Sequence, residues 1–340
     1  MLRIGFSGIT GALGGPETFK TRIIKYLNEM GYDVIYPKDN GYPDVILVTP
    51  GTKRLLWLLT CKLRGSKIVH RLDGINWLHR VNNSSLLDKL KAEIKNWNIK
   101  LIRNYFADYV IYQSEFVYNW WHKEYGSAPC PEKIIYNGTD LNLFNSGKRE
   151  KIKSPVLLCV EGNIVEDRYT LNLITKVTNI LINNNLISAT KICGNLSIKS
   201  QNYLESQQGI EVLGKVNRKQ MPEIYAASDI FLSLDINSAC PNAVIEALAS
   251  GLPVVGYDTG ALKELVTPES GIIVPFGGNP WKLDEPKYEN IADAIKIIIG
   301  DLNKYSIGAR NLAENKLSHR NMCENYISIF NKITNVNLLS

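Results

Sequence analysis

The stretch that decides the fold is Asp229–Tyr257, with the sequence DIFLSLDINSACPNAVIEALASGLPVVGY. Its first seven residues form a short apolar run, which predicts a buried strand. Residues 241–250 begin with a proline and are followed by Gly251. Proline is typical of the first position of a helix and glycine of the position just after its last residue, so this segment predicts a helix. Residues 252–257 predict the next strand. The stretch is therefore a strand, a loop, a helix and a second strand.

The loop of this unit, residues 237–242, runs directly into the N-terminus of the helix. Backbone N–H groups and the helix dipole favour an anion at such a position. Glu246 lies one turn inside the helix, among Ala, Val, Ile and Leu residues. A lone carboxylate on a helix usually faces solvent, but this one could instead accept hydrogen bonds from sugar or ribose hydroxyls. The residues alone leave both interpretations open.

The length and composition of the chain are those of a globular protein that is large enough for two domains. The chain has 340 residues, of which 45% are hydrophobic, enough to fill two cores. Its six cysteines form no CxxC pair and no Cys/His cluster, so we expect neither a disulfide framework nor a zinc site, as suits a reducing cytosol. The sequence has no charged-then-apolar leader and no apolar run approaching the ~20 residues of a spanning helix. We therefore expect a cytoplasmic protein.

Positive charge is concentrated in the first part of the chain. Residues 1–150 contain 21 Lys+Arg against 14 Asp+Glu, net +7, and the remainder contains 18 against 19, net −1, which together give the formal charge of +6. A basic half points to an anionic partner, such as a membrane surface or a lipid phosphate, or it reflects scattered solvation charge. No nucleic-acid-binding motif accompanies it, so nucleic acid is not expected as a partner.

The chain begins with a strand and a glycine-rich loop. Residues 2–8 predict the strand, and a helix follows the loop and ends at Gly31. In α/β folds this arrangement brings backbone N–H groups up to phosphate. Further strands at 32–37, 43–50 and 67–72 alternate with helices, which predicts a parallel, doubly wound sheet with ligands at the carboxyl ends of its strands.

Asp73 and Gly74 follow the strand at 67–72, where the chain must turn. An Asp-Gly pair commonly makes only a turn. His70 lies inside the same strand and could simply be buried there. At this stage the catalytic role of either residue stays open.

A second α/β pattern follows a charged segment. Residues 145–155, NSGKREKIKSP, lack apolar patterning and predict a linker. A strand, a loop and a helix then begin again. We therefore predict two α/β domains, at 1–148 and 149–315, with a cleft between them, and a final helical segment at 316–340.

Residues 86–106 predict a basic helix with apolar residues on another face. Such a helix can lie on an anionic membrane, although it more often packs against its own sheet. Trp97, Trp120 and Trp121 keep the membrane interpretation open. Peripheral membrane contact is therefore carried as a hypothesis.

The stretch quoted first resembles the nucleotide-sugar site of GT-B glycosyltransferases, in particular the retaining glycosyltransferase family 4. The motif of that family is Glu, seven residues, Glu, then Ala-Leu/Met-Ala-x-Gly-x-Pro-Val. Glu246 matches the second glutamate with the following residues in register, whereas Ser238 stands at the first. The resemblance implies that Glu246 holds the ribose and that Ser238 faces the donor sugar without a charge. It places Asn242 and Ala243, at the helix N-terminus, in the same donor site.

Three other positions correspond to family sites less closely. Gly15 matches the second glycine of a Gly-Gly-x-Glu turn near the donor phosphates, and the arginine and lysine that clamp the diphosphate correspond to Asn163 and Arg168. The guanidinium of Arg168 can stabilise the charge on a leaving diphosphate, although Arg168 could also be an ordinary solvent-exposed residue. Asn163 can only donate a neutral hydrogen bond. Asp73 takes the place of a family histidine near the reacting carbon, because His70 comes three residues too early.

Residues 107–114 and 133–144 resemble further family stretches, so the resemblance covers nearly the whole chain. It implies two Rossmann-like domains facing across a cleft, with the last helix packing back toward the first domain. The implied activity is retaining transfer of a sugar from a nucleotide diphosphate sugar to a glycan or lipid-linked acceptor, in cell-surface polysaccharide synthesis at the inner face of the membrane.

The nucleotide sugar would be a substrate, and no cofactor is expected. No Asp-x-Asp pair occurs in the sequence, so we expect no metal either. Two alternatives remain open. One is a catalytically silent GT-B subunit that supports an active partner, and the other is a nucleotide-sugar epimerase, which fits the motif less well.

Overall fold

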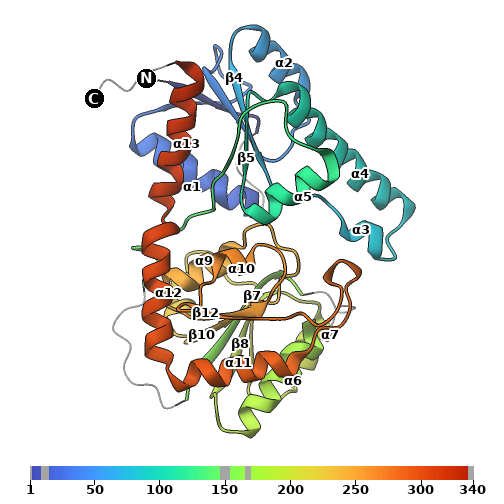
Figure 1. Ribbon diagram of the computed structural model, residues 1–340, viewed down its shortest axis with the longest axis vertical. Helices are drawn as coiled ribbons and strands as arrows, with labels where there is room; N and C mark the ends of the chain where they lie inside the picture. Colours follow the sequence, from blue (N-terminus) through green and yellow to red (C-terminus); the bar gives the residue numbers. More distant parts are fainter. Residues whose placement is uncertain (1, 9–14, 146–153, 165–169, 336–340) are drawn as a thin grey trace. The chain divides into compact units, whose positions relative to one another are not determined.

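The structure is a computed structural model that describes residues 2–8, 15–145, 154–164 and 170–335. The chain forms two compact units (Figure 1). Unit 1 consists of Met1–Asn137 together with His319–Ser340, and unit 2 is Gly138–Ser318. Unit 1 is thus made from both ends of the sequence. The predicted domain boundary after residue 148 falls outside the described residues.

Unit 1 is built on a sheet of six parallel strands, all joined by crossovers. The strands are β1 (Arg3–Phe6), β2 (Asp33–Ile35), β3 (Val45–Val48), β4 (Lys67–Leu72), β5 (Tyr109–Tyr112) and β6 (Glu132–Ile134). Their spatial order is β2-β1-β3-β4-β5-β6. The central strands β3 and β5 are buried along their whole length, as expected when helices cover both faces of a parallel sheet.

One face of this sheet is covered by α1 (Gly15–Glu29) and α13 (His319–Thr334), which lie side by side in Figure 1. The Phe19 and Tyr326 rings of these two helices meet with their centroids 5.2 Å apart. The other face is covered by α2 (Leu55–Leu63) and by the π-helix η1 (Ile102–Phe106). Consecutive strand residues divide between the two layers, so that Leu47 packs toward α1 and Ile46 toward α2.

Three further helices complete unit 1. They are α3 (Leu78–Val81), α4 (Leu86–Leu101), which continues directly into η1, and α5 (Glu115–Tyr125). The predicted basic helix at 86–106 is therefore α4 and η1 together. Trp120 and Trp121 of α5 are buried in the core of the unit, so the idea that they face a membrane is wrong. Trp97 of α4 is 60% exposed.

Unit 2 repeats the architecture with a second parallel sheet of six strands. They are β7 (Val156–Asn163), β8 (Ala189–Asn195), β9 (Ile210–Gly214), β10 (Ile230–Leu232), β11 (Val254–Tyr257) and β12 (Gly271–Val274). Their spatial order, β12-β11-β10-β7-β8-β9, is that of the Rossmann fold. The two doubly wound α/β sheets confirm the predicted fold class.

Helices flank the sheet of unit 2. They are α6 (Thr170–Asn183), α7 (Ile198–Glu205), α8 (Met221–Ala226), α9 (Asn242–Ala249), α10 (Leu262–Leu265), α11 (Tyr288–Gly300) and α12 (Leu302–Lys316), with a 3-10 turn at Pro280–Lys282. Within the described residues, no helix is long and apolar enough to cross a membrane.

Each sheet has one point where the strand order reverses. In unit 1 the reversal lies between β1 and β3, and in unit 2 it lies between β7 and β10. In open α/β sheets the loops at the carboxyl ends of two such strands diverge and leave a crevice where ligands bind. The loops that follow β7 and β10 are therefore the expected ligand-binding loops of unit 2.

Candidate functional site

The loop after β10 carries an asparagine in an unusual conformation. Asn237 has φ 53° and is buried, and asparagine is one of the few residue types that adopts this left-handed backbone without a large penalty. Its side-chain nitrogen Nδ2 is buried without a hydrogen-bond partner among the described residues. Buried polar atoms are normally paired, so this amide is suited to a bound ligand. Asn237 was not among the residues predicted individually from the sequence.

Gly260 holds this loop from the side of β11. It has φ 59°, and a Cβ atom added to it would lie 2.5 Å from the backbone nitrogen of Ser238. The backbone N–H of Ala261 donates to the Ser238 carbonyl oxygen at 2.9 Å. The loops after β10 and β11 are therefore packed backbone against backbone, and only glycine fits at position 260.

The N-terminus of α9 continues from the same loop. Its N-cap residue is Pro241, which makes no side-chain cap hydrogen bond, whereas Ser, Thr, Asp or Asn at that position usually accepts one from the first turn. Asn242 and Ala243 form the first turn and are half-buried, as is Ser238 in the loop. Three of the predicted donor-site residues, Ser238, Asn242 and Ala243, thus lie at one junction, where the helix dipole favours an anion.

Glu246 lies one turn further along α9 and is only 8% exposed, so it does not face solvent. Its Oε1 accepts a hydrogen bond from Arg218 Nη2 at 3.2 Å. Arg218 precedes α8, and its side chain is 54% exposed. The Tyr225 hydroxyl of α8 also donates to the Ala243 carbonyl oxygen at 3.2 Å. An ionised carboxylate has about four lone-pair sites on its two oxygens, so a ligand hydroxyl can bind this group together with Arg218.

The loop after β7 lies at the reversal point of the same sheet. Asn163 is the last residue of β7, and the backbone N–H of Ile164 donates to the Asn195 carbonyl oxygen of β8 at 3.0 Å. Arg168 lies outside the described residues, so its predicted role stays a prediction. Asn163 and the loop after β10 therefore flank one crevice by topology.

In unit 1, Asp73 belongs to a buried polar cluster at the end of β4. Its carboxylate accepts a hydrogen bond from Arg71 Nη1 at 2.6 Å and a second, short one from the Gln113 side-chain amide. Arg71 is 1% exposed and donates through Nη2 to Asn137 Oδ1 at 2.9 Å. Trp121 Nε1 donates to the backbone carbonyl of Asp73 at 2.8 Å. The orientation of the Asp73 side chain is therefore fixed by two donors.

His70 lies in β4 and is completely buried. Its Nε2 makes a short hydrogen bond with the Pro50 carbonyl oxygen. Burial lowers the pKa of His70 to about 4, which keeps the ring neutral near pH 7. These contacts fit a core residue, one of the two interpretations that the sequence left open.

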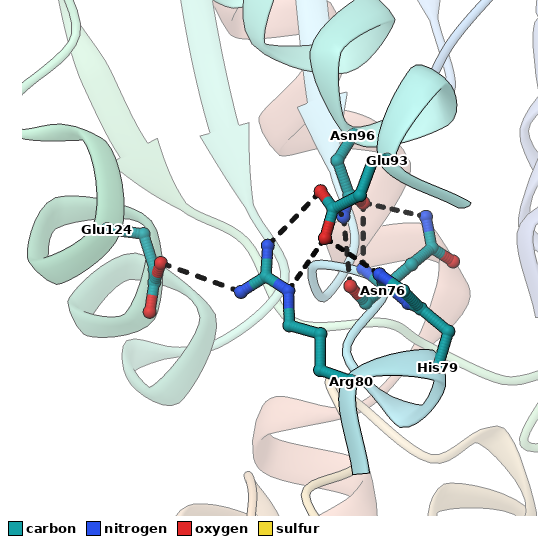
Figure 2. A network of polar contacts seen from close by, with 6 residues as sticks. All are labelled: Asn76, His79, Arg80, Glu93, Asn96 and Glu124. Carbon is teal, nitrogen blue, oxygen red and sulfur yellow. Dashed lines mark hydrogen bonds and ion pairs between the residues drawn. The ribbon is translucent and has the colours of Figure 1, made fainter. Parts of the chain in front are cut away.

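The segment that follows Asp73 is braced against α4 (Figure 2). The backbone N–H of Asn76 donates to Asn96 Oδ1 at 3.0 Å, and Asn96 Nδ2 donates back to the Asn76 carbonyl at 2.9 Å. Glu93 of α4 accepts from Arg80 Nε at 2.8 Å and pairs with His79 Nε2 at 2.7 Å. The hydrogen bond from Arg80 lowers the pKa of Glu93 to about 2.

Gly15 is the exposed first residue of α1. It lies beside the reversal point of unit 1, and the loop residues directly before it are outside the described part of the chain. Gly15 and Asp73 thus occupy the carboxyl edge of one sheet, and Ser238, Asn242, Ala243 and Glu246 occupy one loop and helix of the other. In the part of the chain that the structure describes, no group of three or more His, Cys, Asp or Glu side chains could hold a metal ion.

Part of the chain, mostly in unit 2, is similar to a known protein family. Residues 155–301 match the family model described as Glycosyl transferases group 1. A GDP-mannose-dependent alpha-mannosyltransferase of Mycobacterium tuberculosis is 32% identical over 93 residues, which is 27% of this chain and 22% of the relative.

A second curated relative aligns over more of the chain. It is the GDP-mannose-dependent monoacylated alpha-(1-6)-phosphatidylinositol monomannoside mannosyltransferase of Corynebacterium glutamicum, 25% identical over 268 residues. The alignment covers 70% of this chain and 64% of the relative. The chain therefore spans less than two thirds of the length of either curated relative.

Solved structures share the fold over nearly the whole chain. Sucrose-phosphate synthase from Thermosynechococcus elongatus has a TM-score of 0.73 at 15% identity and covers 99% of this chain and 100% of its own. The Anabaena protein Alr3699/HepE, solved in complex with UDP and glucose, has a TM-score of 0.67 at 15% identity and covers 98% and 100%.

Two Rossmann-like sheets, each with candidate site residues at its carboxyl edge, have the architecture of the GT-B fold, as these solved structures do. For residues 155–301, the match to the Glycosyl transferases group 1 model confirms the family resemblance carried by the motif around Glu246.

Proposed function

We propose that this protein is a retaining glycosyltransferase that moves a sugar from a nucleotide diphosphate sugar to a glycan or lipid-linked acceptor in cell-surface polysaccharide synthesis. The observation that carries the proposal is Glu246, an acidic residue in the family motif register, buried one turn from a helix N-terminus in the ligand-binding loop of unit 2. The match of residues 155–301 to the Glycosyl transferases group 1 model supports the same conclusion.

In this proposal the donor binds to unit 2. The diphosphate lies at the first turn of α9, near Asn242 and Ala243, where the helix dipole favours negative charge. The ribose hydroxyls donate hydrogen bonds to Glu246. Ser238 contacts the sugar as a neutral hydrogen-bond partner, and Arg168 neutralises the diphosphate with help from Asn163. A guanidinium can satisfy two phosphate oxygens at once, which suits it to a leaving group that gains charge.

The reaction breaks the bond between the anomeric carbon and the diphosphate oxygen, and the bonding electrons leave with the diphosphate. The acceptor oxygen forms the new bond on the same face, and its proton passes to the departing phosphate. Asp73 is the candidate catalytic residue of unit 1, where its orientation by Arg71 and Gln113 suits it to bind a hydroxyl of the reacting sugar or acceptor. In this scheme the helix N-terminus and Arg168 stabilise the charge that a divalent ion holds in metal-dependent enzymes.

The names of similar proteins indicate which nucleotides and which class of acceptor to assay. Both curated relatives are named as GDP-mannose-dependent enzymes, and one structural neighbour is described in complex with UDP, so both bases belong in the assay. The name of the Corynebacterium relative specifies a phosphatidylinositol mannoside, which supports a lipid-linked acceptor. Such an acceptor would bring the enzyme from the cytoplasm to the inner face of the membrane.

One alternative is favoured by specific residues. Asn163 and Ser238 stand where the family carries an arginine and a glutamate, so the chain could bind a nucleotide sugar and support an active partner without turning it over. Both functions predict nucleotide binding, but only the enzyme predicts release of free nucleotide.

The test is nucleotide release from a panel of GDP and UDP sugars, measured with and without excess chelator. We expect release from at least one donor, at the same rate when chelator is present. In a glycoside formed with an added acceptor, the anomeric configuration should match that of the donor. Binding without release from any donor would establish the silent subunit instead, and loss of binding in chelator would refute metal independence. Asp73→Asn should abolish release while leaving nucleotide affinity unchanged.

A further inference from the structure

Helix α4 exposes its apolar side chains. Five large apolar residues of this helix are more than half exposed: Leu86 (82%), Leu87 (68%), Leu90 (57%), Ile94 (56%) and Trp97 (60%). The two residues that α4 buries are Asn96 and Ile99. A surface helix of a globular protein normally has its apolar stripe against the core and its polar side in water.

The five exposed residues form one continuous face. At 3.6 residues per turn, successive side chains are rotated by roughly 100°, so Leu86, Leu90 and Trp97 lie within one narrow arc and the other two extend it. The buried Asn96 and Ile99 lie on nearly the opposite side of the same helix. Asn96 makes the polar contacts to Asn76 that attach α4 to the rest of unit 1 (Figure 2). The helix is therefore held by a partly polar face and presents its apolar face outward.

Lysines border this apolar face on both sides. By the same helical geometry, Lys91 and Lys95 lie beyond one edge, and Lys89 and Lys100 lie beyond the other, with Glu93 between Lys100 and Leu86. The first three are exposed. A lysine at such an edge can lay its aliphatic stem along an apolar surface and keep its charge at the boundary.

The acidic residues of α4 cancel only part of this charge. Asp88 pairs with Lys91 at 3.4 Å, and Glu93 is bonded to Arg80 and His79 (Figure 2). Four lysines against two carboxylates leave α4 with a net charge of +2.

We propose that the exposed face of α4 lies on the surface of a lipid bilayer that contains anionic lipids. The leucines, Ile94 and Trp97 enter the boundary between headgroups and acyl chains, and the exposed Lys89, Lys91 and Lys95 contact lipid phosphates. An apolar face bordered by basic residues is the pattern of helices that lie in this interface, and lysines near an anionic leaflet are attracted to it.

A neighbouring helix repeats the pattern. In α2, Leu56 and Leu63 are 81% and 80% exposed, whereas Leu58 and Cys61 face the core. The π-helix η1 contacts both α2 and α4 and exposes Tyr105 by 74%. We assign the main contact to α4, because its apolar face is longer and is bordered by lysines on both sides.

This inference extends the proposed membrane localisation but rests on α4 and not on the donor site. The two can therefore fail separately. Nucleotide release in the absence of vesicles tests the donor site, and vesicle binding in the absence of nucleotide tests α4.

The experiment is co-sedimentation of the full chain with vesicles of phosphatidylcholine, with and without phosphatidylglycerol, at low and high salt. The test variant is Leu90→Gln/Ile94→Gln/Trp97→Gln. Its matched control, Ile198→Gln/Ile297→Gln/Ile307→Gln, changes three side chains of unit 2 that are 80%, 58% and 53% exposed. All six positions are exposed, so both variants should fold, which urea denaturation checks.

We expect wild type and control to bind the anionic vesicles at low salt and to bind less at high salt. The α4 variant should bind at least tenfold more weakly. Lys89→Gln/Lys91→Gln/Lys95→Gln should weaken binding to anionic vesicles by about fivefold for each lysine. The charge control Lys282→Gln/Lys304→Gln/Lys316→Gln, at exposed positions of unit 2, should have little effect.

Two results would overturn the proposal. One is the absence of wild-type binding to anionic vesicles at low salt, and the other is an equal loss of binding in the α4 variant and its control. Sedimentation velocity without lipid completes the test. Self-association that the α4 variant abolishes, with no vesicle binding, would show that a second copy of the chain covers this face.

Discussion

The most direct test of the donor site is the substitution Glu246→Gln. The change keeps the volume and one acceptor oxygen of the side chain and removes only its charge. A hydrogen bond to a charged group contributes about 1.5–3 kcal/mol and a neutral one about 0.5–1.5 kcal/mol. The loss on substitution is therefore about 1–1.5 kcal/mol for one ribose hydroxyl, which corresponds to a five- to tenfold rise in Kd.

The same change should have little effect on folding. Arg218 loses its ion-pair partner, but its side chain is 54% exposed and can be hydrated, and pairs of this kind contribute about 0–1 kcal/mol. The free energy of unfolding should therefore fall by no more than about 1 kcal/mol.

Calorimetric titration with GDP and UDP measures the affinity, and urea denaturation measures the stability. Glu289→Gln, at an exposed position of α11, is the matched control and should leave the nucleotide Kd unchanged. If Glu246→Gln is folded and binds nucleotide as tightly as wild type, then Glu246 serves only to hold Arg218, and the proposed donor site is wrong.

Three further predictions concern the residues around the two candidate sites. Gly260→Ala should weaken nucleotide binding, because the added Cβ would lie 2.5 Å from the backbone of the loop after β10 and displace it; unchanged calorimetry would contradict this. Arg71→Met should destabilise the protein by about 3 kcal/mol in urea denaturation, since it leaves Asp73 without its cation; a loss below 1 kcal/mol would show that Gln113 suffices. The pKa of Glu93 is lowered to about 2, so its carboxylate stabilises the fold above pH ~4.5 and loses that effect as the pH falls toward 2. The stability difference between wild type and Glu93→Gln should therefore narrow in acid, and a constant difference from pH 6 to 3 would refute the assignment.

Local pattern was sufficient to predict the architecture around β10, α9 and β11. An apolar run marks the first strand, and a proline and a glycine mark the two ends of the helix, all within 29 residues. These signals are sufficient because each element is specified by the residues within it. The alternation of such units along the chain then predicts parallel sheets. The order of the strands could be seen only in the structure, because it depends on which strands pair across the chain.

Burial of charged groups could not be read from the sequence. Glu246 is held by Arg218, which comes 28 residues earlier in the chain, and no local signal connects the two. The same holds for the link between Arg71 and Asn137, which are 66 residues apart. Asn237 carries a weak signal, since asparagine before a helix is typical of a turn, but its unpaired amide depends on the surrounding fold.

The sequence also could not predict whether the apolar face of a helix points to the core or to the solvent. Periodicity indicates that α4 has an apolar side, but it does not say whether that side meets the core or the solvent. The tryptophans show the difficulty, because Trp97 is 60% exposed whereas Trp121 is completely buried. Both occur in helices with basic residues nearby, so composition could not separate them.

Unit 1 cannot be completed during synthesis until the last part of the chain has been made, because it consists of Met1–Asn137 together with His319–Ser340. Helix α13 completes the hydrophobic core against α1, and Tyr326 and Phe330 are completely buried in it. A ribosome makes α13 only after all of unit 2, although α1 is among the first segments to leave it. Domains fold as units during synthesis, so unit 2 can reach its native state while the apolar side of α1 still waits for its partner. A nascent chain halted before His319 would therefore carry one finished unit and one with an exposed core, and that intermediate is a natural substrate for chaperones.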